Sequence, residues 1–433
     1  MDSVAVIGLG KLGLPVATQF ALSGFHVVGA DINQATVDAV NSAKEPFPGE
    51  ENLQDSLESV VSSGKLIATT DVTEAVRQAA VIVVTVPVVI DQSLNPDFRA
   101  LDEVASAIGG GLNKGSLVIL ETTVPVGTTR NRFATQIAQS AEMSAHSDFS
   151  VVFSPERVLT GRVFADLRKY PKIVGGIDEA SGEAAVKFYS EALQFDRRTD
   201  LSRPNGVWNV GSCEAAELVK LAETTYRDVN IALANTFAAY AESNGMDILS
   251  VIEAANSQSY SHIHQPGIAV GGHCIPVYPH LYLAGHPDAE LVRTARRVNR
   301  DMPSHAVRRL SEALGGLTGR RVAVLGASYR TGVKETAFSG VWDVTAEIES
   351  LGGTALVHDP LFSDQELRSL GFEVFTLGQF VDGVIIQTDH EAYNSLTSDD
   401  VPEAQVIYDG RRILKVGNFP RCEVISIGDG AGA

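Results

Sequence analysis

The first 31 residues contain the pattern that most restricts the fold of this chain. A short apolar run at 4–7 leads into Gly8-Leu9-Gly10-Lys11-Leu12-Gly13, an amphipathic segment follows at 15–23, and a second apolar run at 26–30 ends at Asp31. A strand, a glycine-rich turn, a helix and a second strand in this order predict a parallel sheet with crossover helices.

The three glycines of this turn match the requirements of a dinucleotide-binding loop. Gly8 permits a tight turn, Gly10 lets the backbone approach a pyrophosphate, and Gly13 allows the following helix to pack closely on the strand. Asp31 ends the second strand, where a carboxylate accepts hydrogen bonds from the adenosine ribose and disfavours the extra phosphate of NADP. We therefore expect NAD as the cofactor, the alternative being a purely structural glycine turn. The expected cofactor contacts in this region are Gly8, Gly10, Lys11, Leu12, Gly13 and Asp31.

Apolar runs later in the chain extend the pattern to two α/β units. After a long segment with helical periodicity at 209–242, a second unit begins with the apolar run 321–327. The expected fold class is therefore α/β, with two Rossmann-like doubly wound domains joined by a long central helix. Further strands are predicted at 81–86, 117–120, 150–153 and 172–175 in the first unit and at 354–357, 383–386 and 406–407 in the second. A glycine-rich end, 428–433, is expected to fray.

Charge and cysteine content exclude several classes of function. A net charge of −19 over 433 residues argues against nucleic acid as a partner, because that affinity comes largely from clustered Lys and Arg. Neither a basic leader with an apolar core nor a run of 18 apolar residues occurs, so we expect no signal peptide and no membrane span. Three widely spaced cysteines form no disulfide framework and no metal knuckle, which predicts a cytoplasmic protein without a bound metal. They are Cys213, Cys274 and Cys422.

Cys274 is the residue whose role the local sequence leaves open. It lies in Gly271-Gly272-His273-Cys274-Ile275-Pro276, where we expect the two glycines to open space for a ligand and His273 to stabilise a thiolate. A lone cysteine is more often a small buried hydrophobe than a nucleophile. These residues alone therefore support a packed thiol and a nucleophile equally.

Five motifs occur in order along most of the chain. They are the N-terminal glycine turn, Glu121-Thr122-Thr123-Val124-Pro125-Val126-Gly127-Thr128-Thr129, Ser154-Pro155-Glu156-Arg157-Val158-Leu159, Ala216-Glu217-Leu218-Val219-Lys220-Leu221 and Gly271-Gly272-His273-Cys274-Ile275-Pro276. Together they resemble the UDP-glucose/GDP-mannose dehydrogenase family. The segments 226–235, 155–159 and 265–267 are similar to the branch of this family that acts on UDP-N-acetylhexosamines, above all UDP-N-acetylmannosamine.

The resemblance implies that Cys274 is a covalent nucleophile in a two-step oxidation. One NAD takes hydride from C6 of the sugar, Cys274 adds to the aldehyde, a second NAD oxidises the thiohemiacetal, and water hydrolyses the thioester to the uronate. Lys220 would stabilise the oxyanion at C6 or transfer a proton, the alternative being a solvated helix lysine. Glu156 would handle the hydrolytic water, unless it is a plain surface carboxylate. Thr123 would hydrogen-bond the reacting centre, unless it only caps the next segment.

Further contacts follow from the same resemblance. The cofactor site would include Thr85 and Pro87, which follow the strand at 81–84, together with Thr123 and Arg330, although Pro87 could simply end the strand. Arg411 is a candidate for contact with substrate phosphate or cofactor. The expected substrate contacts are Glu156, Arg157, Val158, Lys220, Thr224, Gly271, His273 and Arg411.

Four positions depart from the family pattern. Thr224 stands where the helix motif carries asparagine, and Tyr278 where the cysteine motif continues to aspartate. Tyr260 aligns with a substrate-binding arginine, and the segment 329–339 follows its family counterpart only loosely, with Arg330 for a lysine and Ala337 for an arginine. These changes favour a divergent branch with an altered sugar or nucleotide preference.

The resemblance also implies a domain division and a UDP-sugar-binding homodimer. Residues 1–205 would bind NAD, 206–302 would form a helical connector and dimerisation domain carrying Cys274, and 303–433 a Rossmann-like sugar-nucleotide-binding domain. UDP-N-acetylmannosamine is the leading substrate, ahead of UDP-N-acetylglucosamine and UDP-glucose. The competing interpretations are a single-step dehydrogenase of the hydroxyacid type, which the second α/β unit counts against, and a non-catalytic binding regulator.

Overall fold

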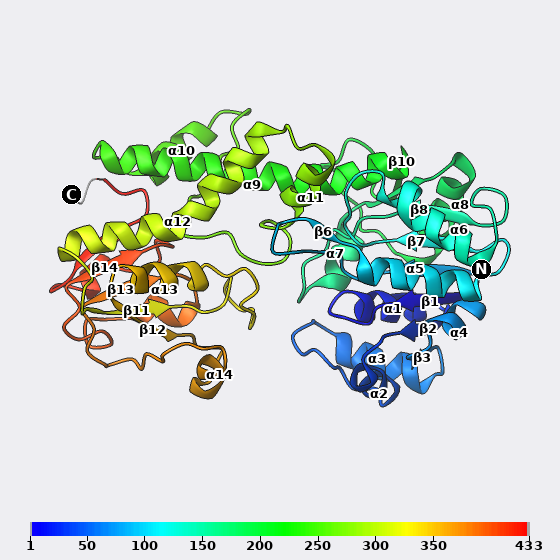
Figure 1. The fold of residues 1–433 in the computed structure, drawn as a ribbon, viewed down its shortest axis with the longest axis horizontal. Helices are drawn as coiled ribbons and strands as arrows, with labels where there is room; N and C mark the ends of the chain where they lie inside the picture. Colours follow the sequence, from blue (N-terminus) through cyan, green and yellow to red (C-terminus); the bar gives the residue numbers. More distant parts are fainter. Residues whose placement is uncertain (1, 431–433) are drawn as a thin grey trace. The chain divides into compact units, whose positions relative to one another are not determined.

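The computed structural model describes residues 2–430, which divide into two compact units (Figure 1). The first contains the chain up to Glu223 together with His280–Gly285, and the second contains Thr224–Pro279 and the chain from His286 onward. Among the described residues, no helix has both the length and the apolar character needed to cross a membrane.

The first unit is built on an eight-stranded sheet whose spatial order is β3-β2-β1-β4-β7-β8-β9-β10. Its strands are β1 (Ser3–Ile7), β2 (His26–Ala30), β3 (Leu66–Thr69), β4 (Val81–Val84), β7 (Leu117–Leu120), β8 (Ser150–Phe153), β9 (Lys172–Gly176) and β10 (Val207–Ser212). A separate hairpin pairs β5 (Val89–Ile90) with β6 (Pro96–Asp97). The strand order of the sheet reverses at β1, because β2 and β3 follow on one side of it and β4 lies on the other side.

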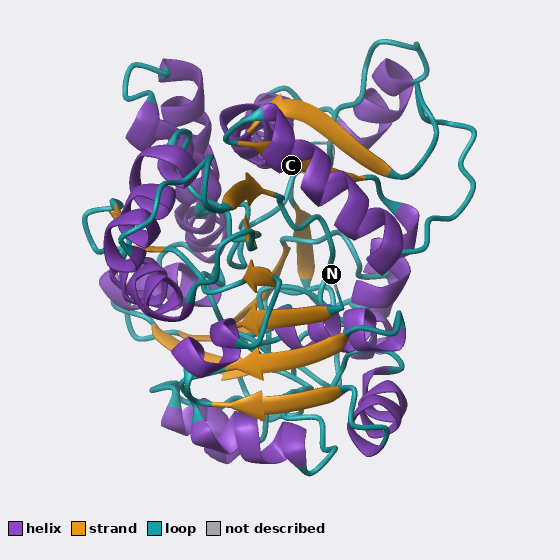
Figure 2. Ribbon diagram, turned by 90° about the vertical axis from the view of Figure 1, so that its right-hand side faces the viewer, coloured by secondary structure: helices purple, strands orange, loops and turns teal. Residues whose placement is uncertain are grey.

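Helices cover both faces of this sheet, as Figure 2 shows. Successive residues of a strand point to opposite faces, so Val4 and Val6 enter one hydrophobic core while Ala5 and Ile7 enter the other. The first core is closed by α1 (Gly13–Leu22), α3 (Leu53–Ser62) and α8 (Glu179–Ala192). The second is closed by α4 (Val72–Arg77), α5 (Arg99–Gly111), the π-helical turn η1 (Thr129–Ala134) and α6 (Thr135–Ala141). The remaining helices of this unit are α2 (Gln34–Asn41) and α7 (Val163–Lys169).

The predicted strands of the first unit are confirmed, with one difference in direction. Strands β1 to β8 of the sheet pair in parallel, but β9 runs antiparallel to β8, with Phe153 opposite Gly175. The expected parallel sheet therefore contains one antiparallel pair, β8 with β9. A consequence is that the first residue of β9, Lys172, lies at the sheet edge where β7 and β8 end.

The long helix predicted at 209–242 is observed as α9 (Cys213–Ser243). Its first four predicted residues belong instead to β10. The helix begins where it does because the hydroxyl of Ser212 accepts a hydrogen bond from the amide of Ala215 at 3.2 Å, which is the contact of an N-cap. After α9 come α10 (Ile248–Asn256), α11 (Tyr278–Gly285) and α12 (Glu290–Leu314).

The second unit contains a five-stranded parallel sheet in the order β12-β11-β13-β14-β15. Its strands are β11 (Arg321–Leu325), β12 (Thr354–His358), β13 (Gly383–Ile386), β14 (Val406–Asp409) and β15 (Glu423–Ser426). One face packs on α12 and α13 (Val341–Ser350), and α14 (Asp364–Ser369) adjoins this core. The other face is covered by loops with the short helices η2 (Glu391–Ser395) and η3 (Val416–Asn418). The predicted α/β architecture with two Rossmann-like units is confirmed.

The glycine-rich end is ordered further than expected. The amide of Gly428 donates to the Glu242 carboxylate at 2.7 Å, and the amide of Gly430 donates to the carbonyl oxygen of Met246 at 2.9 Å. Fraying is therefore wrong for 428–430, because these two contacts fix the backbone to the end of α9. The rest of the predicted fraying segment, 431–433, lies outside the described residues.

Candidate active site

The glycine turn lies where the strand order of the first sheet reverses. β1 leads into Gly8, β4 leads into Thr85, and the Thr85 hydroxyl donates to the carbonyl oxygen of Gly8 at 2.9 Å. A Cβ at Gly13 would lie 1.9 Å from that same oxygen, so only glycine fits. A Cβ at Gly10 would meet no atom within 4 Å. The turn is thus closed on the protein side and open on the other, as a pyrophosphate requires.

Asp31 fixes this turn from the end of β2. One carboxylate oxygen accepts from the amide of Leu9 at 2.7 Å and the other from the amide of Asn33 at 2.8 Å. Within the turn Lys11 is exposed, and Leu12 precedes α1, whose N-terminus carries no side-chain cap. The amides of an uncapped N-terminus, an open glycine and a strand-end carboxylate together fit a dinucleotide such as NAD.

The loops after β4 and β7 form the next part of the same edge. Pro87 is exposed after β4, and the hydroxyl of Thr122 donates to the carbonyl oxygen of Val86 at 2.6 Å, which joins the two loops. Thr123 follows with only 6% of its surface exposed. The structure therefore brings Thr85, Pro87 and the Thr123 loop to the carboxyl edge that also carries the glycine turn.

Lys220 and Glu156 lie next to each other. The Lys220 ammonium, on α9, donates to the main-chain carbonyl oxygen of Glu156 at 2.5 Å. The neighbouring Arg157 forms an ion pair with Glu223 and donates to the carbonyl oxygen of Pro171 at 3.2 Å. Val158 is half-buried in the same loop. The loop after β8 is therefore fixed to α9 at two positions, and the predicted lysine and glutamate are brought together.

A buried charged cluster behind Glu156 was not predicted from the sequence. The ammonium of Lys172 lies 2.8 Å from a carboxylate oxygen of Glu156 and 2.8 Å from one of Glu121. The Tyr189 hydroxyl donates to the same Glu121 oxygen. Burial raises the pKa of Glu121 to about 7, although the Lys172 charge opposes this shift. The sequence signal that could have identified this cluster is a charged residue next to an apolar strand: Glu121 directly after β7, and Lys172 at the start of β9.

Cys274 belongs to the second unit and is exposed. Its carbonyl oxygen accepts from the amide of Tyr278 at 2.9 Å, so the thiol lies in the turn that leads into α11. The adjacent His273 is exposed, and its Nε2 lies 2.6 Å from a carboxylate oxygen of Glu335. The structure therefore places a solvent-accessible thiol beside a histidine–carboxylate pair.

The glycines before Cys274 have a different surrounding from the predicted one. A Cβ at Gly271 would lie 2.7 Å from Cβ of Tyr329, and a Cβ at Gly272 would lie 2.8 Å from the Tyr329 ring. Gly272 also has φ +87°, which L side chains rarely adopt. The expectation that these glycines leave room for a ligand is wrong, because Tyr329 fills that space. They allow close packing of the cysteine turn against the loop after β11.

The remaining predicted contacts are distributed over the second unit. Arg411 donates to the carbonyl oxygens of Gln387 at 2.7 Å and Ala269 at 3.4 Å, so it joins the sheet to the segment before Cys274. The Arg330 guanidinium lies 5.8 Å from the ring centroid of Tyr329. Thr224 is buried one helical turn after Lys220, whereas Tyr260 is 94% exposed.

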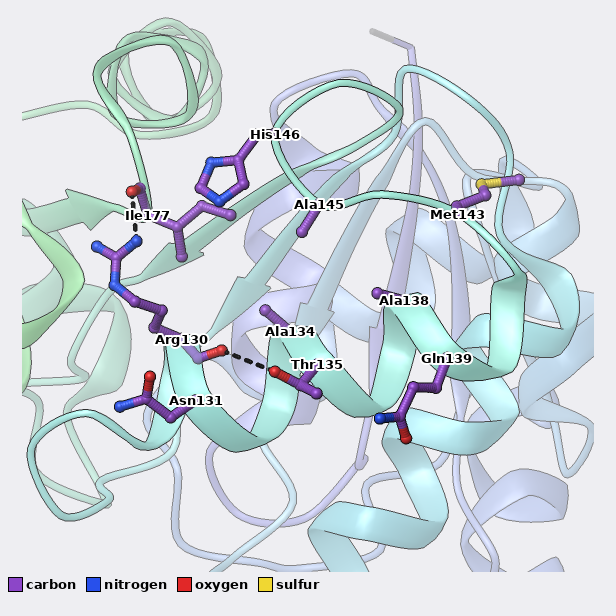
Figure 3. Close-up of a pocket in the computed structure, with 10 residues that line it drawn as sticks. All are labelled: Arg130, Asn131, Ala134, Thr135, Ala138, Gln139, Met143, Ala145, His146 and Ile177. Carbon is purple, nitrogen blue, oxygen red and sulfur yellow. Dashed lines mark hydrogen bonds between the residues drawn. The ribbon is translucent and has the colours of Figure 1, made fainter.

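A hollow of about 430 Å³ on the first unit lies away from these residues (Figure 3). Its lining comes from η1, α6, the segment 143–146 and Ile177, and it contains none of the predicted site residues. Arg130 at its edge donates to the carbonyl oxygen of Ile177 at 2.7 Å and forms an ion pair with Glu214. This hollow is therefore not part of the candidate site.

Comparison with protein families identifies matches along most of the chain. The UDP-glucose/GDP-mannose dehydrogenase family matches with its NAD binding domain at residues 2–193, its central domain at 214–301 and its UDP binding domain at 323–416.

Individual proteins match over nearly their whole length. UDP-N-acetyl-D-mannosamine dehydrogenase of Pyrococcus horikoshii is 34% identical over 420 residues, covering 95% of this chain and 96% of the relative. NDP-N-acetyl-D-galactosaminuronic acid dehydrogenase of Ralstonia solanacearum is 32% identical, covering 94% and 95% respectively. The solved structure of the UDP-D-ManNAc dehydrogenase from Pyrococcus horikoshii superimposes with a TM-score of 0.88 at 32% identity, covering 99% of this chain and 100% of that one.

Proposed function

Because the chain belongs to the UDP-glucose/GDP-mannose dehydrogenase family, we propose that it oxidises the C6 alcohol of UDP-N-acetylmannosamine to the carboxylate. The family resemblance expected from five motifs is thereby confirmed, and the chain is an NAD-dependent nucleotide-sugar oxidoreductase. The observation that supports this sugar is the name of several relatives matched over almost their full length, all of them UDP-N-acetyl-D-mannosamine dehydrogenases.

The cofactor would bind at the carboxyl edge of the first sheet. Gly10 would leave the pyrophosphate free access, the start of α1 would offer amides, and Asp31 would accept hydrogen bonds from the ribose. Thr85, Pro87 and the Thr123 loop would line the nicotinamide side. NAD supplies the acceptor for the hydride that leaves C6 in each of the two oxidations.

In the first oxidation, Lys220 would stabilise the negative charge that develops on the C6 oxygen as its proton leaves. An ammonium held by a main-chain carbonyl is already oriented, so it does not reorganise during the reaction. The product of this step is the aldehyde.

Cys274 would then hold the aldehyde covalently. Its sulfur forms a bond to C6 while the thiol proton passes to the oxygen, which gives a thiohemiacetal. Loss of the remaining C6 hydride and of the hydroxyl proton leaves a thioester on the same sulfur. His273 and Glu335, paired beside the cysteine, support a proton-accepting role next to the thiol.

Hydrolysis of the thioester would use Glu156 as a base for water. Water adds to C6 and one of its protons passes to the Glu156 carboxylate. The C–S bond breaks, and the second proton of the water restores the thiol as the uronate is released. Thr123 and Glu156 lie on neighbouring loops of one sheet edge, after β7 and β8. This arrangement supports a shared role in binding that water.

The number of NADH molecules formed per sugar tests the proposal. Purified protein would be mixed with excess NAD and a limiting amount of each of four nucleotide sugars: UDP-N-acetylmannosamine, UDP-N-acetylglucosamine, UDP-glucose and a dTDP-sugar. We expect two NADH per molecule of UDP-N-acetylmannosamine and slower reaction with the others. One NADH with release of aldehyde would identify a single-step dehydrogenase, and cofactor binding without NADH formation would identify a regulator.

Cys274→Ser tests the covalent step separately. We expect the variant to bind NAD as the wild type does and to form no uronate, because an alkoxide does not replace the thiolate at neutral pH. Mass spectrometry of the quenched wild-type protein is expected to detect the thioester on Cys274. Full uronate formation by the variant would refute the covalent route.

Three consecutive segments of the chain would have separate roles. Residues 1–205 would bind NAD, 206–302 would connect the domains and form the dimer contact, and 303–433 would bind the UDP moiety, in line with the UDP binding domain matched at 323–416. The homodimer is supported by exposed apolar side chains on α9, considered below. The three cysteines are separate thiols, which suits the reducing conditions of the cytoplasm.

A further inference from the structure

Glu121, Lys172, Glu156 and Tyr189 form a charged cluster in the interior of the first unit. Lys172 and Glu121 have 5% and 1% of their surface exposed, and Glu156 has 7%. One ammonium is 2.8 Å from a carboxylate on each side, and Tyr189 donates to the Glu121 oxygen that Lys172 also contacts. The ammonium also lies 4.9 Å from the centroid of the Tyr189 ring.

The cluster exists because β9 is antiparallel to β8. Glu121 follows β7 and Glu156 follows β8 at the carboxyl edge of the sheet, and Lys172 begins β9 at that same edge. The Ser154 hydroxyl donates to the carbonyl oxygen of Ile173 at 2.8 Å, which fixes the start of β9 against the Glu156 loop. Lys172 is therefore held at one position behind the candidate base.

The charges of the cluster do not balance when both acids are ionised. Two carboxylates share one ammonium, and the burial of a net charge is costly. Tyr189 stays neutral, because burial raises its pKa well above the ordinary value. In the described part of the chain, the second oxygen of Glu121 is buried without a hydrogen-bond partner. One of the two carboxylates is therefore protonated more readily than the other.

We propose that Lys172 is a positioning residue that holds Glu156 as an oriented carboxylate, and that Glu121 is the acid of this cluster that takes up the proton. This inference rests on the proposed role of Glu156 as the base for thioester hydrolysis.

The asymmetry between the two acids follows from their surroundings. Burial is the largest cause of the raised pKa of Glu121, about 7, and the Glu156 charge adds to it. The Glu156 carboxylate also accepts a hydrogen bond from the amide of Arg157 at 3.0 Å, which adds to its fixed orientation. Below pH 7 Glu121 is mainly neutral, so the Lys172 charge acts on Glu156 alone. Above pH 7 Glu121 ionises, and the two carboxylates then share the Lys172 charge.

The other charged groups near Glu156 do not replace Lys172. Lys220 on α9 donates to the main-chain carbonyl oxygen of Glu156. The Arg157 guanidinium is paired with Glu223. The Lys172 ammonium thus contacts one carboxylate oxygen of Glu121 and one of Glu156. The other titratable groups that face it are Glu121, directly after β7, and Tyr189 on α8.

The test compares Lys172→Met, Lys172→Arg and Glu121→Gln with the wild type in a pH series. Two readouts are used: the rate of uronate formation and the fraction of protein that carries the thioester after quenching. For Lys172→Met we expect the acid limb of the rate profile to move up by one pH unit or more. Thioester should accumulate at pH 7, with the rate at least about tenfold lower, because general-base catalysis contributes 10²–10⁴-fold.

The other two variants test the charge of Lys172 and the acid of Glu121 separately. Lys172→Arg keeps the charge and should return the acid limb to within about half a pH unit of the wild type. Glu121→Gln removes the acid that shares the Lys172 charge above pH 7, so it should leave the acid limb within about half a pH unit of the wild type and make the rate less dependent on pH above 7. The KM for the sugar nucleotide should change less than about threefold in all three variants, since none of them touches the sugar.

The outcomes separate this inference from the proposed function. If the wild type forms two NADH per sugar but Lys172→Met lowers the rate equally at every pH, without thioester accumulation, the lysine is only structural and the inference is wrong. If the wild type forms one NADH, the proposed function itself fails. Should Lys172→Met fail to fold, as judged by thermal unfolding and NAD binding, the Glu121→Gln profile decides, and a pH dependence above pH 7 equal to that of the wild type overturns the inference.

Discussion

The ammonium of Lys220 lies 2.5 Å from the main-chain carbonyl oxygen of Glu156, which connects α9 to the loop after β8. This contact fixes the direction of a flexible side chain before any substrate binds, and a preorganised cation is worth more in a transition state than one that must be ordered.

Replacement of Lys220 by Met should therefore lower kcat by about 10²-fold or more, the effect found when one oxyanion-stabilising group is removed. NAD affinity should be unchanged, because the lysine is not on the glycine turn. Lys220→Arg is the matched control: it keeps the charge but changes its geometry, so partial activity is expected. Stopped-flow measurement of the first NADH separates this step from hydrolysis, and a rate within tenfold of the wild type would contradict the role of Lys220.

Substitution by alanine should affect two glycines of the cofactor turn differently, one through protein stability and the other through NAD binding. Gly13→Ala places a Cβ 1.9 Å from the Gly8 carbonyl oxygen, so the backbone must shift, at a cost of about 1–3 kcal/mol in the free energy of unfolding. Gly10→Ala meets no atom and should leave this free energy nearly unchanged, while its methyl group obstructs the pyrophosphate. Thermal unfolding with and without NAD measures both effects. An NAD-induced stabilisation of Gly10→Ala equal to that of the wild type would show that NAD binds elsewhere.

Glu217 makes the stability of the first unit depend on pH. It accepts from the amides of Gly127 at 2.5 Å and Thr129 at 2.8 Å, which fixes the loop that carries Thr123. Burial raises its pKa from 4.5 to about 7, so the native state binds this proton more tightly than the unfolded chain does. The resulting stability is fully present below pH 4.5 and is lost as pH rises through 7.

The comparison of Glu217→Gln with the wild type isolates this contribution. Urea unfolding at pH 5 and pH 7.5 should show that the wild type loses on the order of 2–3 kcal/mol relative to the variant over this interval. Other groups that titrate in the same range, including Glu121, are present in both proteins and cancel in the difference. A pH-independent difference would mean that Glu217 is ionised throughout.

Strands buried on both faces were predictable from the sequence, whereas the two edge strands of the first sheet, β3 and β10, were not. β7 and β8 occur at the predicted residues, because every residue or nearly every residue in them is buried and apolar. β3 has one buried residue out of four and β10 has none, so neither contains a recognisable apolar run. These two strands lack the hydrophobic signal because one side of each faces solvent or a loop.

The site was predictable where its residues come from one local motif. Gly8, Gly13 and Asp31 follow from a strand–turn–helix pattern, since their tasks are set by the turn itself. Lys172 was missed because its relevance depends on the direction of β9, which no local pattern encodes. The environment of Gly272 was misjudged for a similar reason: the group that fills its open side is Tyr329, which is 57 positions further along the chain.

The exposed apolar side chains of α9 carry the last prediction. Tyr226, Leu233 and Tyr240 are spaced by seven residues, which places them on one face of the helix, and they are 56%, 43% and 65% exposed. Phe237, 38% exposed, lies on the same face. A continuous row of large apolar side chains on one face is typical of a protein–protein interface, and we propose that a second copy of this chain covers it.

Leu233→Asp combined with Tyr240→Asp should convert the dimer into monomers, because two buried carboxylates per copy would have no partner charge in a symmetric interface. Sedimentation equilibrium at micromolar protein concentration should give twice the chain mass for the wild type and the single chain mass for the variant. Phe380→Asp is the control, since Phe380 is 62% exposed and lies in the loop before β13 and not on α9. A wild-type protein that sediments as a monomer, or a control that dissociates equally, would exclude this face of α9 as the dimer contact.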